Sequence, residues 1–226
     1  MFKPIDLFDL TQTEHAALFD GCEFAWDALK RLKAYIEART GAAPPHAFGS
    51  QVFMWPHVLI GEGTVIEPGA MIKGPAIIGQ NCEIRHGAYI RDHVIVGDGC
   101  VIGNSSELKH AFLFNGCQVP HFNYIGDSIL GHKAHLGAGV ILSNLKSLPG
   151  NVTVEVNGQP HDTGLRKFGA MLGDKADIGC NSVLNPGTVI GRGTVMYPLT
   201  NWRGVAGPNR IVKNKAAVEV VERRMK

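Results

Sequence analysis

The sequence contains no apolar run of the roughly 18 residues that a membrane-spanning helix requires. Its first residues, Met1 to Asp6, also lack the cationic start and the apolar stretch of a signal peptide. These two absences argue against a membrane-spanning or secreted protein. We therefore expect the chain to act in the cytoplasm, without a membrane partner.

Paired cysteines and charge of one sign are also missing. The five cysteines are an odd number and form no CxxC pair, which fits a reducing compartment better than a disulfide framework. The 22 Lys and Arg residues nearly balance the 20 Asp and Glu residues, and they are scattered along the chain. Since binding to a phosphate backbone requires a one-sided basic patch, nucleic acid is not an expected partner.

Glycine and proline, in contrast, are abundant. The 226 residues include 28 glycines and 12 prolines, which is too many for a helical bundle. With 45% hydrophobic residues, the composition is also too apolar for a disordered chain. The combination predicts a folded protein with many tight turns.

A repeat of six residues explains these turns. From Ile60 onward, every sixth residue is aliphatic or aromatic and is often followed by glycine, so each hexad predicts a short strand and a bend. The pattern slips between Pro120 and Tyr124, and it resumes from Leu130 to Leu142 and from Leu172 to Met196. Before the slip, the repeated residues are Ile60, Ile66, Ile72, Ile78, Ile84, Ile90, Val96, Ile102, Leu108 and Phe114.

A strand this short cannot bury its apolar residue alone. Three such strands that close a triangular coil can stack these residues on the coils above and below. Neighbouring coils then lie about 4.8 Å apart, and Arg91 is expected above Lys109. The sequence therefore predicts an all-β solenoid, a parallel β-helix.

Three regions follow from the extent of the repeat. Residues 51–200 form the predicted β-helix, which an inserted loop interrupts at residues 147–164. Residues 1–50 form an N-terminal helical segment. Residues 201–226 form a C-terminal tail, whose part from Lys213 onward predicts a short polar helix.

Local patterns predict the structure of the N-terminal segment and of the inserted loop. The segment from Phe24 to Glu37 carries its apolar residues along one side, as an amphipathic helix does, with Asp20 as a candidate cap and Gly41 as a stop. In the inserted loop, residues 152–156 alternate between apolar and polar, and Asn157 begins an Asn-Gly turn signal. The loop is therefore expected to form a small β-hairpin arm.

Departures from a plain repeat mark the candidate site, because an ordinary coil needs only apolar inward residues and small corner residues. Most departures fall between Arg91 and Asn144, and four of the ten histidines lie between His110 and His135. In chain order, the polar motifs are Glu107-x-Lys109, His121-x-x-Tyr124 followed by Gly126-Asp127, Gly137-Ala138-Gly139, and Asn144.

In this order and spacing, the motifs resemble the acetyltransferase domain of the bacterial bifunctional enzyme that makes UDP-N-acetylglucosamine. The similarity covers roughly residues 58–200, and it places the chain among proteins that resemble the hexapeptide-repeat acyltransferases. The helical start, residues 163–169 and residues 185–187 are also similar to short stand-alone proteins often labelled as pyrophosphorylase-related. The resemblance implies a left-handed β-helix, which the repeat alone does not determine. It also implies a homotrimer with active sites between neighbouring prisms.

The resemblance further implies that an acetyl group moves from acetyl-CoA to the amine of an amino-sugar phosphate. Glucosamine 1-phosphate is the expected acceptor, in the synthesis of UDP-N-acetylglucosamine or a related nucleotide sugar. This chemistry needs a base that works near neutral pH, cations for the phosphate and donors for the oxyanion. His121 is the expected base and Glu107 the residue that orients its ring. No metal is expected in the acyl-transfer site.

The same resemblance implies the binding residues. Contacts to the sugar phosphate are expected from Arg91, Lys109, Tyr124, Asn144 and Lys167. Ala138 and Cys180 are expected to face the thioester and the pantetheine arm of CoA. His135 takes the place of an asparagine that contacts the substrate in the family, and the inserted arm is longer than in the family. These two departures leave the identity of the acceptor open.

Nucleotidyl transfer is not expected from this chain. It requires a glycine-rich phosphate loop after a strand, together with carboxylates that hold Mg²⁺. Residues 1–57 contain neither feature. A separate protein could supply uridyl transfer.

Two other functions remain open at this point. The prism fold is shared by γ-type carbonic anhydrases, and residues 131–136 are loosely similar to their metal loop, with His110 about one coil earlier. Three neutral imidazoles in that arrangement would suit zinc. In the other alternative, the prism binds a sugar nucleotide without transferring any group to it.

Overall fold

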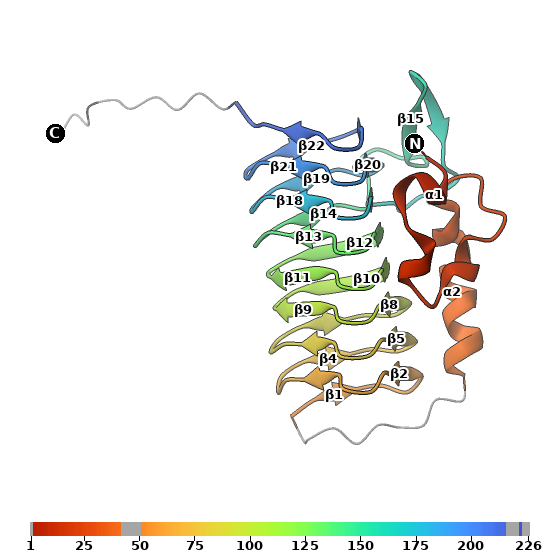
Figure 1. Cartoon of the computed structure of the whole chain (residues 1–226), viewed down its shortest axis with the longest axis vertical. Coiled ribbons are helices and arrows are strands. Elements are labelled where there is room, and N and C mark those ends of the chain that lie inside the picture. Colours follow the sequence, from red (N-terminus) through yellow and green to blue (C-terminus); the bar gives the residue numbers. More distant parts are fainter. Residues whose placement is uncertain (1, 42–50, 216–221, 223–226) are drawn as a thin grey trace.

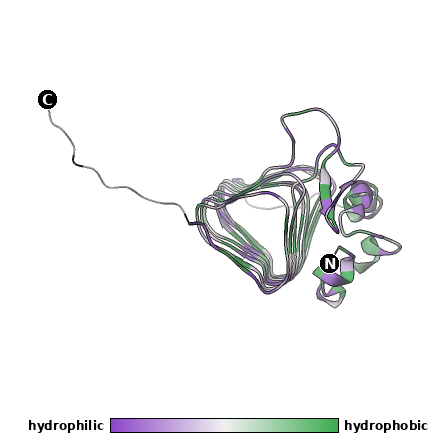
Figure 2. Cartoon of the chain, turned by 90° about the horizontal axis from the view of Figure 1, so that it is seen from above, coloured by the Kyte–Doolittle hydropathy of each residue, from purple (hydrophilic) through white to green (hydrophobic). Residues whose placement is uncertain are grey.

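The computed structural model describes residues 2–41, 51–215 and 222. In this part of the chain, stacked coils form a prism, and a small helical lobe lies along one side of it (Figure 1). The view from above shows the triangular cross-section of the prism (Figure 2). The prism is a left-handed parallel β-helix, which confirms the predicted fold. Among the described residues, no helix combines the length and apolar character needed to cross a membrane.

Each coil contributes short parallel strands to three faces. Face 1 stacks β1 (Phe53–Met54), β4 (Met71–Ile72), β7 (Tyr89–Ile90), β10 (Glu107–Leu113), β12 (Tyr124–Leu130), β14 (Ile141–Leu142), β19 (Val183–Leu184) and β22 (Asn201–Trp202). Face 2 stacks β2 (Val58–Ile60), β5 (Ala76–Ile78), β8 (Val94–Val96), the second halves of β10 and β12, β17 (Ala170–Leu172), β20 (Thr188–Ile190) and β23 (Val205–Ala206). Face 3 stacks β3 (Val65–Ile66), β6 (Glu83–Ile84), β9 (Val101–Asn104), β11 (Gln118–His121), β13 (His135–Leu136), β18 (Asp177–Ile178), β21 (Val195–Met196) and β24 (Ile211–Val212).

The interior of the prism is one continuous apolar core. From Ile72 to Leu108, all the predicted inward residues are buried in it. The expected stacking of Arg91 on the coil of Lys109 is also present, because the Arg91 N–H donates to the Leu108 carbonyl at 2.8 Å. The faces of the prism meet at corners, of which two border the candidate site. The first corner joins face 1 to face 2, and the third corner joins face 3 to face 1 of the next coil.

The register differs from the prediction at the first corner. Leu113, and not Phe114, points into the prism, so this coil is one residue shorter than predicted after Leu108. The next coil shortens at the same corner, after Ile125. The predicted slip at residues 120–124 was therefore misplaced, because apolar residues on both sides of the true slip hide the change of phase.

The helical lobe covers the outer side of face 2. It comprises α1 (Pro4–Leu7), two short 3-10 helices, η1 (Leu10–Gln12) and η2 (Ala16–Phe19), and α2 (Asp27–Thr40). The outward side chains of face 2, among them Ile95, Phe112 and Ile129, are buried in a second core with side chains of the lobe. Faces 1 and 3 have no such cover from the described chain (Figure 2).

Helix α2 confirms the predicted amphipathic helix with shifted ends. It starts at Asp27 and ends at Thr40, directly before the predicted stop at Gly41. Asp20 does not cap it, which corrects the prediction. The side chain of Asp27 itself accepts a hydrogen bond from the Phe24 N–H at 2.9 Å and so fixes the entry to the helix.

The inserted loop forms the predicted hairpin arm. Strands β15 (Thr153–Val156) and β16 (Gln159–Asp162) pair in antiparallel fashion. The arm packs on the helical lobe, because Val154 is buried in the second core and the His161 ring lies 4.5 Å from the Phe24 ring between centroids.

The β-helix continues past the boundary expected at residue 200. Strands β22, β23 and β24 pair with the coil below and carry the prism to Val212. The predicted boundary is too early because the spacing between inward residues shortens from Trp202 to Ala206. Most of the expected polar helix, residues 216–221 and 223–226, lies outside the described residues.

Candidate active site on face 1

The outward side chains of face 1 form two files that run along the prism. The file beside the third corner consists of Phe53, Met71, Tyr89, Glu107, Tyr124 and Ile141. The file beside the first corner consists of Trp55, Lys73, Arg91, Lys109, Gly126 and Ser143. Five predicted site residues therefore lie on or beside the middle of this face: Arg91, Glu107, Lys109, Tyr124 and Asn144.

An ion pair links two of the predicted residues. Arg91 Nη1 donates to Glu107 Oε1 at 2.8 Å, and this hydrogen bond raises the pKa of the Arg91 guanidinium. Glu107, which was expected to orient the His121 ring, thus contacts Arg91 in this chain. The pair fixes the direction of the guanidinium across the face.

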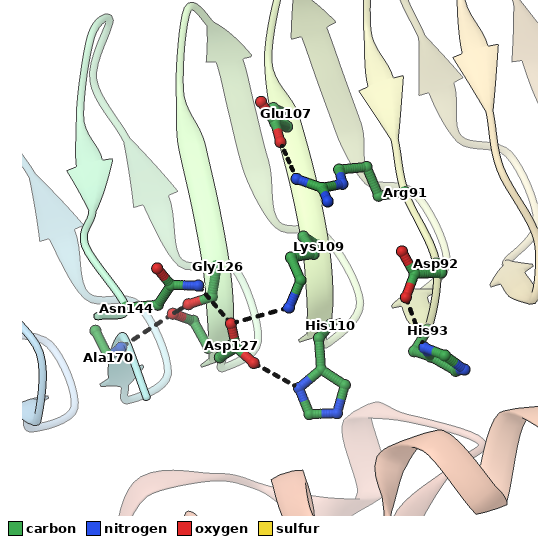
Figure 3. A network of polar contacts seen from close by, with 11 residues as sticks. Arg91, Asp92, His93, Glu107, Lys109, His110, Gly126, Asp127, Asn144 and Ala170 are labelled. Carbon is green, nitrogen blue, oxygen red and sulfur yellow. Dashed lines mark hydrogen bonds and ion pairs between the residues drawn. The ribbon is translucent and has the colours of Figure 1, made fainter. Parts of the chain in front are cut away.

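A buried carboxylate organises the first corner (Figure 3). Asp127, whose side chain is 7% exposed, accepts hydrogen bonds from His110 Nδ1 at 3.0 Å, from Lys109 Nζ at 3.4 Å and from the Asn144 side-chain amide. Burial alone would raise the pKa of Asp127, but the hydrogen bonds from His110 and Asn144 and the charge of Lys109 lower it. The network therefore contains a carboxylate ion at neutral pH.

The shortened corner produces this network. His110 and Asp127 both adopt the left-handed backbone region, with φ values of 47° and 44°, where their coils turn from face 1 to face 2. From the sequence, His110 is expected only as a zinc candidate and Asp127 only as part of a motif. The five-residue spacing from Leu108 to Leu113 is the only trace of this corner in the described sequence, and Phe114, which continues the six-residue repeat equally well, hides it.

A glycine makes room for the contact between two predicted binding residues. A Cβ atom on Gly126 would lie 2.5 Å from Asn144 Nδ2 and 2.7 Å from the Tyr124 hydroxyl oxygen. Burial, together with the charges of Glu107 and Asp127, raises the pKa of Tyr124. The phenol therefore stays protonated and can donate a hydrogen bond.

His121, Ala138 and Cys180 share the third corner. His121 ends β11 and is exposed, and within the described chain its ring makes no hydrogen bond. The Gly139 N–H donates to the His121 carbonyl at 3.0 Å, and the Asn181 N–H donates to the Ala138 carbonyl at 2.8 Å. The predicted base and the predicted CoA contacts thus lie on successive coils of one edge of the prism.

The other two predicted binding residues lie apart from this edge. Lys167 forms an isolated antiparallel bridge with Leu145 at the base of the arm, next to Asn144. His135 lies on face 3, where its Nδ1 contacts Asp177 Oδ1 at 2.8 Å. The structure therefore brings Lys167, but not His135, to face 1 of the same chain.

The three histidines of the zinc alternative are not gathered into one site. His110 contacts Asp127, His132 Nδ1 contacts the Asn115 carbonyl at 2.8 Å, and His135 contacts Asp177. Across the described ranges, no three His, Cys, Asp or Glu side chains are arranged to hold a metal ion.

The chain is similar in sequence to bifunctional sugar-nucleotide proteins. A family model, the GMPPB C-terminal domain, matches residues 72–158. The bifunctional protein GlmU of Methanococcus maripaludis is 39% identical over 140 residues, which are 62% of this chain and 34% of that protein. The bifunctional sugar-1-phosphate nucleotidylyltransferase/acetyltransferase of Sulfurisphaera tokodaii is 36% identical over 97 residues, 43% of this chain and 24% of that protein. The matched part thus spans well under half of these relatives.

The similarity to solved structures is more distant. A putative acetyltransferase from Desulfovibrio desulfuricans G20 is 18% identical, with a TM-score of 0.36, and the match covers 83% of this chain and 31% of that one. PerB from Caulobacter crescentus, solved with CoA and GDP-perosamine, is 20% identical, with a TM-score of 0.31 over 74% of this chain and 63% of that one.

Proposed function

Because the β-helix of this chain is related to the bifunctional nucleotidylyltransferase/acetyltransferase proteins, we propose that the chain is an acetyl-CoA-dependent N-acetyltransferase. Its acceptor is the amine of an amino-sugar phosphate, with glucosamine 1-phosphate as the first candidate, in the synthesis of UDP-N-acetylglucosamine or a related nucleotide sugar. One observation carries the proposal. Face 1, which carries Arg91 and Lys109, borders the third corner of the prism. At this corner His121 is exposed, and its ring has no hydrogen-bond partner among the described residues.

In the proposed reaction, the neutral amine attacks the carbonyl carbon of the thioester. A carbon–nitrogen bond forms, the carbon–sulfur bond breaks, and CoA leaves as a thiol. The proton lost by the amine passes to His121 and then to the leaving sulfur. His121 suits this role because its exposed ring has no partner in the described chain that would occupy its nitrogens.

The acceptor is held by the two files of face 1. Arg91 offers a planar fork to a phosphate, and Lys109 offers a point charge. Both cations are already fixed by carboxylates, Glu107 and Asp127, so little side-chain freedom is lost when the phosphate binds. Tyr124, as a protonated phenol, donates to a sugar hydroxyl or to the phosphate.

The proposal includes a homotrimer with one site at each subunit interface. The helical lobe covers face 2, so a neighbouring prism has faces 1 and 3 available for contact. A neighbour at the third corner would enclose the edge that carries His121, Ala138 and Cys180. His135, on face 3, would then contribute to a site only if the interface brings it to a neighbour's face 1.

We expect His121→Ala to lower the turnover number at least about 100-fold, which is the usual contribution of a general base. His86→Ala is the matched control, because His86 is an exposed histidine at the same corner two coils below and lies outside the proposed site. The measurement is CoA thiol release from acetyl-CoA with glucosamine 1-phosphate, UDP-glucosamine and related amines as acceptors.

The outcomes separate the possible functions. Release that depends on an amine and is lost only in His121→Ala supports the transferase. Full activity of His121→Ala would remove this residue from the mechanism. No release with any amine would contradict the transferase and favour a protein that binds sugar nucleotides without modifying them.

A further inference from the structure

The lower part of face 1 carries exposed aromatic side chains that the proposed transfer step does not use. Phe53 and Trp55, on the first described coil, are 54% and 46% exposed. The Lys73 ammonium lies 5.8 Å from the centroid of the Trp55 ring and 5.6 Å from that of the Tyr89 ring. We call these four residues, Phe53, Trp55, Lys73 and Tyr89, the lower subsite.

The lower subsite is continuous with the proposed phosphate site. Lys73, Arg91 and Lys109 occupy the same position on three successive coils, because the Lys73 N–H donates to the Ile90 carbonyl and the Arg91 N–H donates to the Leu108 carbonyl. Coil spacing sets the backbones of these three residues about 4.8 Å apart along the prism. The file thus carries three cationic residues in a row, one more than the two that we assign to the acceptor phosphate.

Lys73 differs from the other two cations in its partners. Arg91 pairs with Glu107 and Lys109 with Asp127, whereas among residues 2–41, 51–215 and 222 no carboxylate pairs with Lys73. Its described neighbours are the faces of two aromatic rings. The uncompensated positive charge in this file therefore lies between the phosphate site and the exposed aromatics.

The geometry points to a nucleoside diphosphate in the lower subsite, so that a nucleotide-linked amino sugar takes the place of glucosamine 1-phosphate as the preferred acceptor. This inference rests on the proposed function. One phosphate lies at Arg91 and Lys109, the second lies toward Lys73, and the base stacks on Trp55 or Phe53. From the coil of Lys109 to the coil of Trp55 the distance is three coil spacings, or about 14 Å, which an extended nucleoside diphosphate can span.

The chemistry of the lower subsite fits a nucleotide better than it fits a purely apolar ligand. Every nucleobase has a π-face that stacks on aromatic side chains, and the attached phosphates require cations close by. The upper part of the face offers no such combination, since its outward residues are Ile141, Val183 and Asn201 in one file and Ser143, Asn185 and Arg203 in the other. We therefore place the nucleotide below the phosphate site and not above it.

The test measures binding to the full chain by calorimetry, with UDP, pyrophosphate and uridine as probes. We expect Lys73→Gln to weaken UDP and pyrophosphate binding about tenfold or more. Trp55→Leu should weaken UDP and uridine binding but leave pyrophosphate binding unchanged, because it removes the stacking surface while Lys73 keeps its charge and its contact with the Tyr89 ring. The matched controls are Tyr197→Leu and Lys213→Gln, which alter another exposed aromatic side chain and the lysine 6.0 Å from its centroid, outside face 1.

Calorimetry needs no turnover, so the two proposals fail separately. UDP binding that depends on Lys73 and Trp55 supports the lower subsite even if no acetyl transfer is found. Acetyl transfer to glucosamine 1-phosphate, without any UDP binding, would overturn the lower subsite and leave the transferase intact. A change of oligomeric mass in Trp55→Leu, with UDP affinity unchanged, would also overturn it, because the aromatics would then form a contact between chains.

Discussion

At the scale of single residues, the site depends on a carboxylate that is not expected to touch the substrate. Asp127 is buried, and it holds Lys109, His110 and Asn144 through one pair of oxygen atoms. Because a buried charge is costly without partners, these contacts are mutually dependent. Asp127 therefore acts as a positioning residue for the cation that we expect to bind the acceptor phosphate.

We expect Asp127→Asn to raise the acceptor KM about tenfold with little change in kcat, because Lys109 loses the charge that fixes it. The free energy of unfolding should fall by about 2 kcal/mol, since His110 and Lys109 lose a charged partner in a buried place. Initial rates and urea unfolding measure the two effects. An unchanged acceptor KM would show that Asp127 has only a structural role.

The pH dependence of this stability loss has a defined sign. The pKa of Asp127 is lowered in the folded chain, so its carboxylate stabilises the fold above the unfolded-state pKa of about 3.9, and this stabilisation is lost as pH falls through the lower native value. The difference between wild type and Asp127→Asn should therefore be fully present at neutral pH, begin to shrink near pH 4, and disappear only below the lowered native pKa of Asp127. Asp177→Asn is the matched control, because it removes the carboxylate that contacts His135, and both of these side chains are exposed.

The candidate site was predictable only where short motifs carried it. Lys109 and Tyr124 belong to motifs that resemble a known family, the same resemblance implies Arg91, and the structure places all three residues on face 1. The contacts of Asp127 with His110 were not predictable, since they exist only because the first corner is shortened. The apolar pattern hides that shortening, as either Leu113 or Phe114 could continue it.

At the scale of elements, the helical lobe and the outward side chains of face 2 share the second core. Phe114 lies outside the prism, with its ring 5.0 Å from Phe8 and 4.8 Å from Phe112 between centroids. A further link joins the lobe to the coil of Arg91, because His93 contacts Glu37 of α2 at 3.2 Å. The lobe therefore stabilises face 2 directly, and through it the first corner.

We expect Phe114→Ala to lower the stability of the docked lobe by about 3 kcal/mol or more, because a fully buried ring leaves a cavity in a packed cluster. Hydrogen exchange should then report faster opening of α2 (Asp27–Thr40), while amides of upper strands on face 3, such as β21 (Val195–Met196), keep their protection. Ile5→Ala is the control, since Ile5 is an exposed residue of the same lobe. Unchanged exchange in α2 would mean that this cluster does not hold the lobe.

The prism was predictable because each hexad repeats the same local signal, an apolar residue followed by a bend. The part of the lobe that precedes α2 was not predictable, since helices as short as α1, η1 and η2 carry no periodic pattern. Their places are set by contacts with the outward residues of face 2. All three residues of β8 (Val94–Val96) are apolar and buried, and this lack of alternation was the available signal that the face is covered on both sides.

At the scale of the whole molecule, the third corner has the character of a contact surface. Phe122 and Leu199 are 59% and 67% exposed there, and both adopt the left-handed region, with φ values of 53° and 60°. Large side chains rarely adopt this conformation, and exposing them to water is unfavourable as well. Burial against a neighbouring prism would offset both costs, which supports the proposed trimer.

In analytical ultracentrifugation, we expect the wild-type protein to sediment as a trimer and Leu199→Glu to sediment as a monomer. The reason is that a charge buried at an apolar contact without a partner is strongly unfavourable. Leu148→Glu is the matched control, since Leu148 is also highly exposed but belongs to the inserted arm. Leu199 lies on the coil above Cys180, three coils above His121, so loss of acetyl transfer in Leu199→Glu would report loss of assembly or of the adjacent CoA contact, and not damage to the base. A Leu199→Glu protein that keeps the wild-type mass would exclude this corner from the interface, and full activity in a single-chain state would show that one prism contains the complete site.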